Sequence, residues 1–469
     1  MEAFRIARPE TTDTLDLEAF EAGLSGSIVL PGSPDYDVAR QVHSAINDRR
    51  PALIVRAADA NDVAKTVVLA RESGLTLSVR GGGHSLAGYG TNDGGIVLDL
   101  GAMKGLHIDP DRRVAWAQPG LTAGEYTNAA AAHGLATPFG DTGSVGISGL
   151  TLGGGIGWLV RKYGLAIDAL EAVEIVTADG REITASEESH PDLFWAVRGG
   201  GGNFGVVTRF QFKLFPVSQI LGGALFMPAT KEVLRSLVPI AASAPEELST
   251  ISLLMTLPPA PFIPADLVGT QSLTIMFVWS GDDPADGQAA LQPFREVATP
   301  LVEMTMPMPY PGIYAMLADA EQRSLSVHRS RFLTMIDDEA VDSIFDAMAA
   351  PSSPGAVVQL RVLGGAMSRV PAEATAFAHR DAAVMALIMT NFEDIGTEAT
   401  HRAWTDALHD ALGKNDAGVY SNFLEVEGEE RIRAAYPGGT YERLSEVKRR
   451  YDPSNLFRMN QNIHPAAMG

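Results

Sequence analysis

The segment VRGGGHSLAGYGTNDGGIVLDL, residues 79–100, carries three consecutive glycines directly before a histidine, His84. Glycine has no Cβ and readily adopts positive φ, so successive backbone N–H groups can converge on one anion. We therefore predict a phosphate-binding concavity over Gly81 to Ser85, with the His84 imidazole beside it.

The residues around this loop predict alternating helices and strands. Asp59 is suited to cap a helix whose apolar residues recur on one face, and Gly74 is suited to end it. Strands are predicted over 75–79, 96–100 and 113–118.

Two further glycine-rich blocks follow, at 141–165 and 198–216. In the first of them, Gly153, Gly154 and Gly155 leave the backbone bare over three residues. We predict that these three glycines permit a second close approach to a flat or extended ligand.

The third glycine block of the chain, 198–216, contains a G-x-G-x-x-G pattern at Gly200, Gly202 and Gly205. A dinucleotide-binding Rossmann motif follows a strand and opens a helix. Here the pattern follows a helix-like segment, 191–197, and precedes a strand, 206–214. The order is wrong for a Rossmann domain, and no P-loop pattern occurs either.

The character of the chain changes near residue 217, where the glycine blocks end and strand-like apolar runs begin. Many strands with little glycine indicate a largely antiparallel sheet covered by helices. The segment 255–316 is dense in proline and methionine and is predicted to form loops and pocket lining. We expect three parts: 1–216 and 416–469 forming one domain, and 217–415 inserted into it.

Four segments carry a resemblance to a known family: 79–100, VGISGLTLGGGIGWLVRKYGLAID (145–168), PDLFWAVRGGGGNFGVVT (191–208) and YDPSNLFRMNQNIHP (451–465). Together, and in this order, they resemble the FAD-linked oxidases with the vanillyl-alcohol-oxidase type of fold, and within these the berberine-bridge-enzyme-like group. The resemblance implies an α+β fold. A PCMH-type FAD-binding domain of two α/β subdomains would carry an inserted substrate domain of antiparallel sheet covered by helices.

The resemblance also implies which residues hold FAD. The ring nitrogen of His84 would be joined covalently to the flavin, and this would be the single link. The second link of many relatives uses a cysteine at the position of Thr142, and this chain has no cysteine. The remaining cofactor-binding candidates are Arg80, Gly81, Gly82, Gly83, Ser85, Gly146, Gly149, Gly153, Gly154, Gly155, Val206, Val207, Asn460 and Asn462.

The candidate catalytic residues depart from the family. In the segment YSNF, 420–423, Phe423 stands where the resemblance implies a tyrosine that acts as catalytic base. A phenyl ring cannot accept a proton. Asn422, Gln359 and Tyr420 are the catalytic candidates, although packing explains Tyr420 better than a role as base does. Gln359 and Arg361 share one strand face by the two-residue period. The substrate-contact candidates are Gln359, Arg361, Asn422 and Phe423.

Composition restricts the partners. The net charge of −21 disfavours nucleic acid and anionic membranes. The absence of cysteine excludes disulfides and thiolate metal sites, and no paired ligand motif indicates a metal. With no signal peptide or membrane-spanning run in view, we expect a cytoplasmic monomer or homodimer.

We therefore expect an FAD-dependent oxidase. It would take a hydride from an amine or alcohol carbon of a small, apolar or aromatic substrate and pass electrons to O2, giving H2O2. Two alternatives remain open: a flavoprotein that sequesters a ligand with little turnover, and an FAD-dependent dehydrogenase that uses another acceptor.

Overall fold

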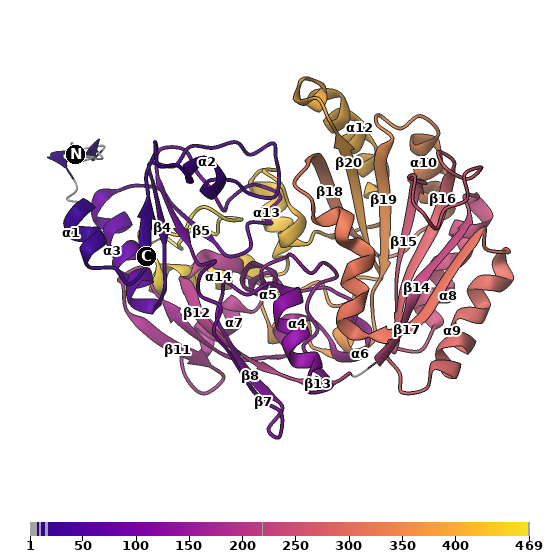
Figure 1. The fold of residues 1–469 in the computed structure, drawn as a ribbon, viewed down its shortest axis with the longest axis horizontal. Helices are drawn as coiled ribbons and strands as arrows, with labels where there is room; N and C mark the ends of the chain where they lie inside the picture. Colours follow the sequence, from indigo (N-terminus) through magenta and orange to yellow (C-terminus); the bar gives the residue numbers. More distant parts are fainter. Residues whose placement is uncertain (1–6, 9–10, 15–16, 218, 468–469) are drawn as a thin grey trace.

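The computed structural model describes residues 7–8, 11–14, 17–217 and 219–467, and three sheets organise it (Figure 1). Two of the sheets are built from the first 216 residues, and the third is built from the middle of the chain. In Figure 1 the C-terminal segment, drawn in yellow, returns to the N-terminal body. The middle third of the chain is thus an insertion into a body made by both ends.

The first sheet has strand order β3-β4-β6-β5, in which β4, β6 and β5 run parallel. Its helix α3 has the predicted caps: the Asp59 side chain accepts from the Asp62 N–H, and Gly74 is left-handed with φ of 69°. The elements are β3 (Ser27–Val29), β4 (Leu53–Arg56), β5 (Leu77–Arg80), β6 (Ile96–Asp99), α1 (Leu17–Ala22), α2 (Tyr36–Ala39) and α3 (Ala60–Ser73). The glycine loop connects β5 to β6, as the sequence predicts.

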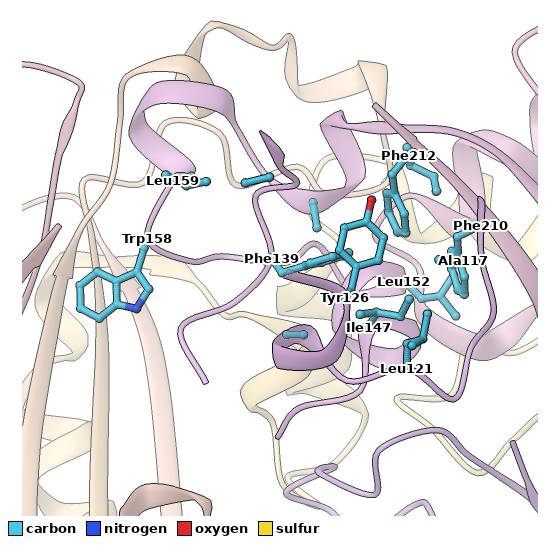
Figure 2. Close-up of a cluster of buried hydrophobic side chains, with 14 of the residues drawn as sticks. Ala117, Leu121, Tyr126, Phe139, Ile147, Leu152, Trp158, Leu159, Phe210 and Phe212 are labelled. Atoms are coloured by element: carbon cyan, nitrogen blue, oxygen red, sulfur yellow. The ribbon is translucent and has the colours of Figure 1, made fainter. Parts of the chain in front are cut away.

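The second sheet is antiparallel, with order β11-β10-β12-β8-β7. Figure 2 shows part of its core, where Tyr126, Phe139 and Phe212 pack edge to face. The strands are β7 (Leu106–Asp109), β8 (Val114–Ala117), β10 (Leu170–Val176), β11 (Glu182–Ser186) and β12 (Val206–Lys213). The helices of this part are α4 (Ala123–Ala131), α5 (Ile147–Leu152), α6 (Val160–Tyr163), α7 (Pro191–Val197), α13 (Glu429–Ala435) and α14 (Thr440–Tyr451).

The third sheet has eight antiparallel strands in the order β17-β14-β16-β15-β19-β20-β18-β21. These strands are β14 (Gln219–Pro228), β15 (Leu248–Thr256), β16 (Gln271–Trp279), β17 (Val302–Pro309), β18 (Leu325–Leu333), β19 (Gly355–Val362), β20 (Val384–Phe392) and β21 (Asp416–Gly418). Its helices are α8 (Lys231–Ser243), α9 (Pro284–Val297), α10 (Asp338–Ala349), α11 (Ala366–Arg369) and α12 (Glu398–Ala411). The predicted antiparallel sheet covered by helices is confirmed.

The two faces of this sheet have different partners. Val358 and Leu360 of β19 belong to a core shared with α8, α9, α10 and α12, which lie on the outer side of the sheet in Figure 1. Because strand residues alternate between faces, Gln359 and Arg361 lie on the opposite face, toward the N-terminal body. The expected boundary at 415/416 falls at the start of β21, which pairs with β18.

One local prediction needs correction. The proline- and methionine-dense segment 255–316 is not all loop, since it contains β16, α9 and the edge strand β17. An edge strand tolerates proline because one row of its N–H groups has no partner strand. Residues Phe215–Pro216, just beyond the predicted strand 206–214, form a further short strand, β13, paired with β9 (Leu135–Ala136). The described N-terminal residues add a ribbon of β1 (Ala7–Arg8) and β2 (Thr11–Thr14).

Across the described ranges, none of the helices combines the length and apolar character that crossing a bilayer requires.

Candidate active site

A cavity of about 430 Å³ lies between the N-terminal body and the inserted sheet. One side is formed by the glycine loop after β5, the second glycine block and the start of β12. The opposite side is formed by strands β18, β19 and β20, and the C-terminal segment contributes Asn460 and Gln461. The four motif segments, which are far apart in sequence, therefore meet around one space.

The first glycine loop packs directly against the second. A Cβ added to Gly82 would lie 2.3 Å from the backbone N of Gly146, and one added to Gly81 would lie 2.2 Å from Ser148 Oγ. Gly83 has φ of 71°, in the left-handed region. These glycines allow two backbones to meet at the cavity wall.

Arg80 and Ser85 flank the loop, and both line the cavity. The Arg80 guanidinium donates to Asp99 at 2.8 Å and to the Gln41 carbonyl at 3.2 Å. The Ser85 hydroxyl accepts from the Tyr89 N–H at 3.3 Å. Arg80 is thus held by protein partners and stiffens the loop.

His84 is half-buried and lines the cavity. Its ring stacks on His43, with centroids 4.2 Å apart and planes inclined by 19°. Burial, together with the neighbouring His43, lowers the pKa of His84 to about 4. The imidazole is therefore neutral near pH 7, with a nitrogen lone pair available.

In the second glycine block, Gly146 and Gly149 line the cavity, whereas Gly153, Gly154 and Gly155 do not. A Cβ on Gly153 would lie 2.1 Å from Asn422 Oδ1, and the Gly155 N–H donates to the Tyr420 hydroxyl at 2.8 Å. The predicted close approach at these three glycines is therefore made by protein side chains, from Asn422 and Tyr420 and from Phe377 and Ala166. No ligand is needed to explain it.

At the other end of the cavity, Val206 and Val207 line it at the start of β12. Asn203, which the sequence did not single out, donates to the Gln461 carbonyl at 3.1 Å and accepts from the Ile463 N–H at 2.9 Å. The Asn203 side chain thus links the C-terminal signature, residues 451–465, to the third glycine block. Its only signal in the sequence is its place within that block.

The C-terminal asparagines differ in position. Asn460 lines the cavity and donates to the Phe457 carbonyl at 3.0 Å, whereas Asn462 does not line it. The Oδ1 atoms of both are buried, and neither has a hydrogen-bond partner among the described residues. A buried amide oxygen without a partner costs free energy, so both oxygens remain able to accept hydrogen bonds.

These features fit FAD, the cofactor that the resemblance implies. A Cβ built on Gly149 or Gly202 would meet no atom within 4 Å, so both backbones border open space in the cavity. The lining extends from His84 to Val207, as an extended dinucleotide requires, and the unpartnered Asn460 oxygen lies along it.

The wall opposite the glycine loops, called the substrate wall, consists of His328, Gln359, Arg361, Leu387 and Met389 from the inserted sheet and Phe423 from the C-terminal segment. The Arg361 guanidinium is 3% exposed and pairs with Asp141, and it donates to the Ile156 carbonyl at 3.1 Å. The charge of Arg361, on the inserted sheet, is thus compensated by Asp141 of the N-terminal body. Gln359 Oε1 lies 3.4 Å from the same guanidinium.

The segment 420–423 forms a short helical turn below this wall. The Asn422 amide donates to the Leu150 carbonyl at 3.0 Å and to the Tyr420 hydroxyl at 2.9 Å. Burial raises the pKa of Tyr420, which disfavours its ionised form. Phe423 packs edge-on against Tyr420, with ring centroids 5.2 Å apart.

His328 is a cavity residue that the sequence reasoning missed. It lies on β18, paired with Met389 of β20 in register. Its Nδ1 lies 3.6 Å from Glu425 Oε1, and its backbone N–H donates to the same oxygen at 2.9 Å. The run LSVHRSRFL gives a strand pattern, but nothing in it marks which face meets the cavity.

Glu425 is buried, and burial alone would raise its pKa. Hydrogen bonding and charge from His328 and Arg402 instead lower the pKa of Glu425 to about 2. Arg329 also donates to this carboxylate, at 3.0 Å. Glu425 is therefore an anion held behind the His328 ring.

Within the described ranges, no group of three or more histidine, aspartate or glutamate side chains is arranged to hold a metal ion.

Two family models match the chain. Residues 51–186 match the FAD binding domain, and residues 419–464 match the family described as berberine and berberine like. The first match contains β4 to β11 with both glycine loops, and the second contains the 420–423 turn and the C-terminal signature.

Relatives match over nearly their whole length. The chain is 32% identical over 464 residues to (R)-6-hydroxynicotine oxidase of Paenarthrobacter nicotinovorans, covering 94% of this chain and 97% of that one. It is 31% identical over 466 residues to an FAD-linked oxidoreductase of Bacillus subtilis, with coverage of 94% and 97%.

Solved structures have the same fold. The crystal structure of 6-hydroxy-D-nicotine oxidase from Arthrobacter nicotinovorans superposes with a TM-score of 0.86 at 30% identity, covering 95% of this chain and 99% of that one. A glucooligosaccharide oxidase of Acremonium strictum gives a TM-score of 0.84 at 25% identity, with coverage of 96% and 100%.

Proposed function

This chain belongs to the FAD-linked oxidoreductases that combine an FAD binding domain with a berberine-like C-terminal segment, and on that premise we propose the reaction it carries out. It oxidises an amine or alcohol carbon of a small, apolar or aromatic substrate, using FAD attached through His84, with O2 as electron acceptor and H2O2 as product. The observation that carries the proposal is one cavity with His84 and the glycine loops on one side and the substrate wall on the other.

The residues assigned to FAD are those that border the cavity. Neutral His84 would hold the flavin through a ring nitrogen, and Gly81 to Gly83 would direct backbone N–H groups to the pyrophosphate. Val206 and Val207 would contact the adenine side, and Asn460 the ring system. A related glucooligosaccharide oxidase carries a 6-S-cysteinyl, 8α-N1-histidyl FAD, which supports the histidyl link. The cysteinyl link has no counterpart here because the chain contains no cysteine.

The chain's own residues supply binding, orientation and exclusion of water. Leu387, Met389 and Phe423 give the substrate wall an apolar surface, and Gln359 adds one amide. Because Arg361 is paired with Asp141, the wall presents no uncompensated guanidinium to attract a carboxylate. When bound, FAD would accept from the substrate a hydride, which carries two electrons, and would pass these two electrons to O2.

The decisive test is anaerobic reduction of the purified holoprotein. We would add (R)-6-hydroxynicotine, benzylamine, benzyl alcohol and, as a sugar control, xylobiose, and follow the visible flavin band. We expect an amine or alcohol with an aromatic group to bleach the band faster than xylobiose does. Readmitted O2 should restore the band and release one equivalent of H2O2. If none of the four compounds bleaches the band, the proposed reaction is wrong.

One observation favours a second candidate function, a flavoprotein that sequesters its ligand. Phe423 stands where the family resemblance implies a tyrosine base, and a phenyl ring cannot remove a proton. Under this alternative a compound would shift the flavin band without bleaching it. An FAD-dependent dehydrogenase is distinguished by slow recovery of the band in O2 and fast recovery with an artificial acceptor.

A further inference from the structure

We propose that His328 is the proton acceptor of the reaction, and that the Glu425 carboxylate is a positioning group that orients it. This inference rests on the proposed function, because it names the residue that completes it. It also supplies the acid–base group that Phe423 cannot provide.

The position of His328 on the sheet places it in the substrate wall. It pairs with Met389, which lies two residues from Leu387, and Leu387 pairs with Gln359. Residues that pair across strands, or that lie two apart on one strand, share a face. His328 is therefore on the same face as the other strand residues of the substrate wall, and it lines the cavity.

The other polar groups of this wall are not available as bases. Gln359 is an amide with no useful basicity, and Arg361 is permanently cationic. Asp141, which also borders the cavity, is engaged by Arg361. Histidine is the side chain whose charge ordinarily changes between pH 5 and 8, which suits a general base.

Glu425 is the carboxylate next to the ring. Its Oε1 lies 3.6 Å from Nδ1, and we infer that this negative charge favours a proton on Nδ1 and leaves the lone pair on Nε2. Arg402 donates to Glu425 at 2.6 Å and Arg329 at 3.0 Å, so the carboxylate is itself held in place. This is the arrangement of a base with an orienting acid behind it.

The proposed step balances as follows for an alcohol carbon. The C–H bond breaks and its hydrogen leaves as hydride, carrying two electrons to oxidised FAD. The O–H bond breaks and its proton passes to Nε2 of His328. The electron pair of the O–H bond forms the C=O bond, so the alcohol is oxidised to a carbonyl compound. An amine follows the same accounting, with N–H in place of O–H and an imine as product.

The pH dependence identifies the base. The charged groups around His328 are Glu425, Arg329 on the same strand, Arg402 and Asp406 on α12, and Arg361 on β19. The rate of anaerobic flavin reduction in the wild type should rise with pH, because a general base must be unprotonated to accept the proton. A rate that is flat from pH 5 to 9 would overturn the inference without any variant.

The variant test uses His328→Gln, with His401→Gln as matched control. His401 is also buried, but it lies on α12 and bonds to Thr397 and Ser352, away from the cavity. With the fastest compound of the four-compound panel, His328→Gln should slow flavin reduction by about 10²- to 10⁴-fold and abolish its pH dependence. His401→Gln should leave both unchanged. Flavin reduction by His328→Gln at the wild-type rate and with the wild-type pH profile would contradict the proposal.

Glu425→Gln tests the positioning role. Loss of the carboxylate removes a charge that favours the imidazolium, so the midpoint of the pH–rate profile should move to lower pH. A merely structural role would lower the rate without moving the midpoint. If the wild-type flavin is not reduced by any of the four compounds, the proposed function fails. If it is reduced but the profile is insensitive to His328, only the present inference fails.

Discussion

The imidazole rings of His43 and His84 lie face to face, with centroids 4.2 Å apart and planes inclined by 19°. The backbone joins them as well, because the His43 N–H donates to the Gly83 carbonyl at 3.0 Å. His43 comes from the loop after α2 and His84 from the glycine loop. The ring expected to carry the flavin is therefore held between a neighbouring ring and the cavity.

The first prediction concerns the covalent bond. Acid precipitation of the wild-type holoprotein should leave the yellow colour in the pellet, and the peptide that contains His84 should carry the mass of FAD. His84→Ala should release all of its flavin into the supernatant while still binding FAD in the folded state, because the glycine loops remain. Flavin in the supernatant of the wild type would refute the link.

The second prediction concerns His43. His43→Phe keeps a flat ring against His84, whereas His43→Ala removes it. We expect His43→Ala to lower the covalent fraction at least several-fold, as measured by mass analysis after incubation of apoprotein with FAD. We expect His43→Phe to retain most of the covalent fraction. Equal covalent fractions in the two variants would mean that the stack does not position His84.

The lowered pKa of His84 leads to a prediction about pH. An imidazole whose pKa is about 4 in the folded state is neutral, and therefore nucleophilic, at every pH well above 4. Attachment of FAD to the wild-type apoprotein should thus be independent of pH between 6 and 8. An attachment rate that rises steeply over this range would mean that His84 titrates near its ordinary value.

Much of the fold could be predicted because its signals are local. Asp59 and Gly74 mark the ends of α3 by their own cap geometry, and the strands beside the glycine loop follow from their apolar runs. The resemblance then supplied the assembly of the parts, which local patterns do not contain.

The parts that could not be predicted depend on long-range register. Whether His328 or Arg329 meets the cavity is decided by the pairing of β18 with β20, and a shift of one residue would exchange them. The sequence likewise does not reveal that Tyr420 would accept from the Gly155 N–H, 265 residues away. Three consecutive glycines look like a ligand site, whether a ligand or a side chain fills the space beside them.

The third prediction concerns a buried ion pair that holds the C-terminal signature. Lys448 and Asp452 are both fully buried, with Nζ 2.6 Å from the carboxylate, and Nζ also donates to the carbonyls of Asn203 and Phe457. Lys448→Met would leave Asp452 buried without its counter-charge. We expect a loss of about 3–5 kcal/mol in the free energy of unfolding, measured by denaturant titration of the apoprotein.

The neighbouring position offers a control for this variant. Arg449 pairs with Glu446 at 2.8 Å, but both side chains are about half exposed. Arg449→Met should cost less than about 1 kcal/mol, because water screens such a pair. Similar losses in the two variants would show that burial of the Lys448 pair is not what makes it important.

The fourth prediction separates packing from catalysis at Tyr420. Its hydroxyl accepts from the Gly155 N–H at 2.8 Å and from the Asn422 amide at 2.9 Å. Tyr420→Phe leaves both donors without this partner, which should cost about 1–3 kcal/mol of stability. Because burial raises the pKa of Tyr420, its phenolate is scarce near pH 7 and cannot be the main base. Anaerobic flavin reduction in Tyr420→Phe should therefore stay within about threefold of the wild-type rate and keep the wild-type pH profile. Loss of the pH profile in this variant would mean that Tyr420, and not His328, is the proton acceptor.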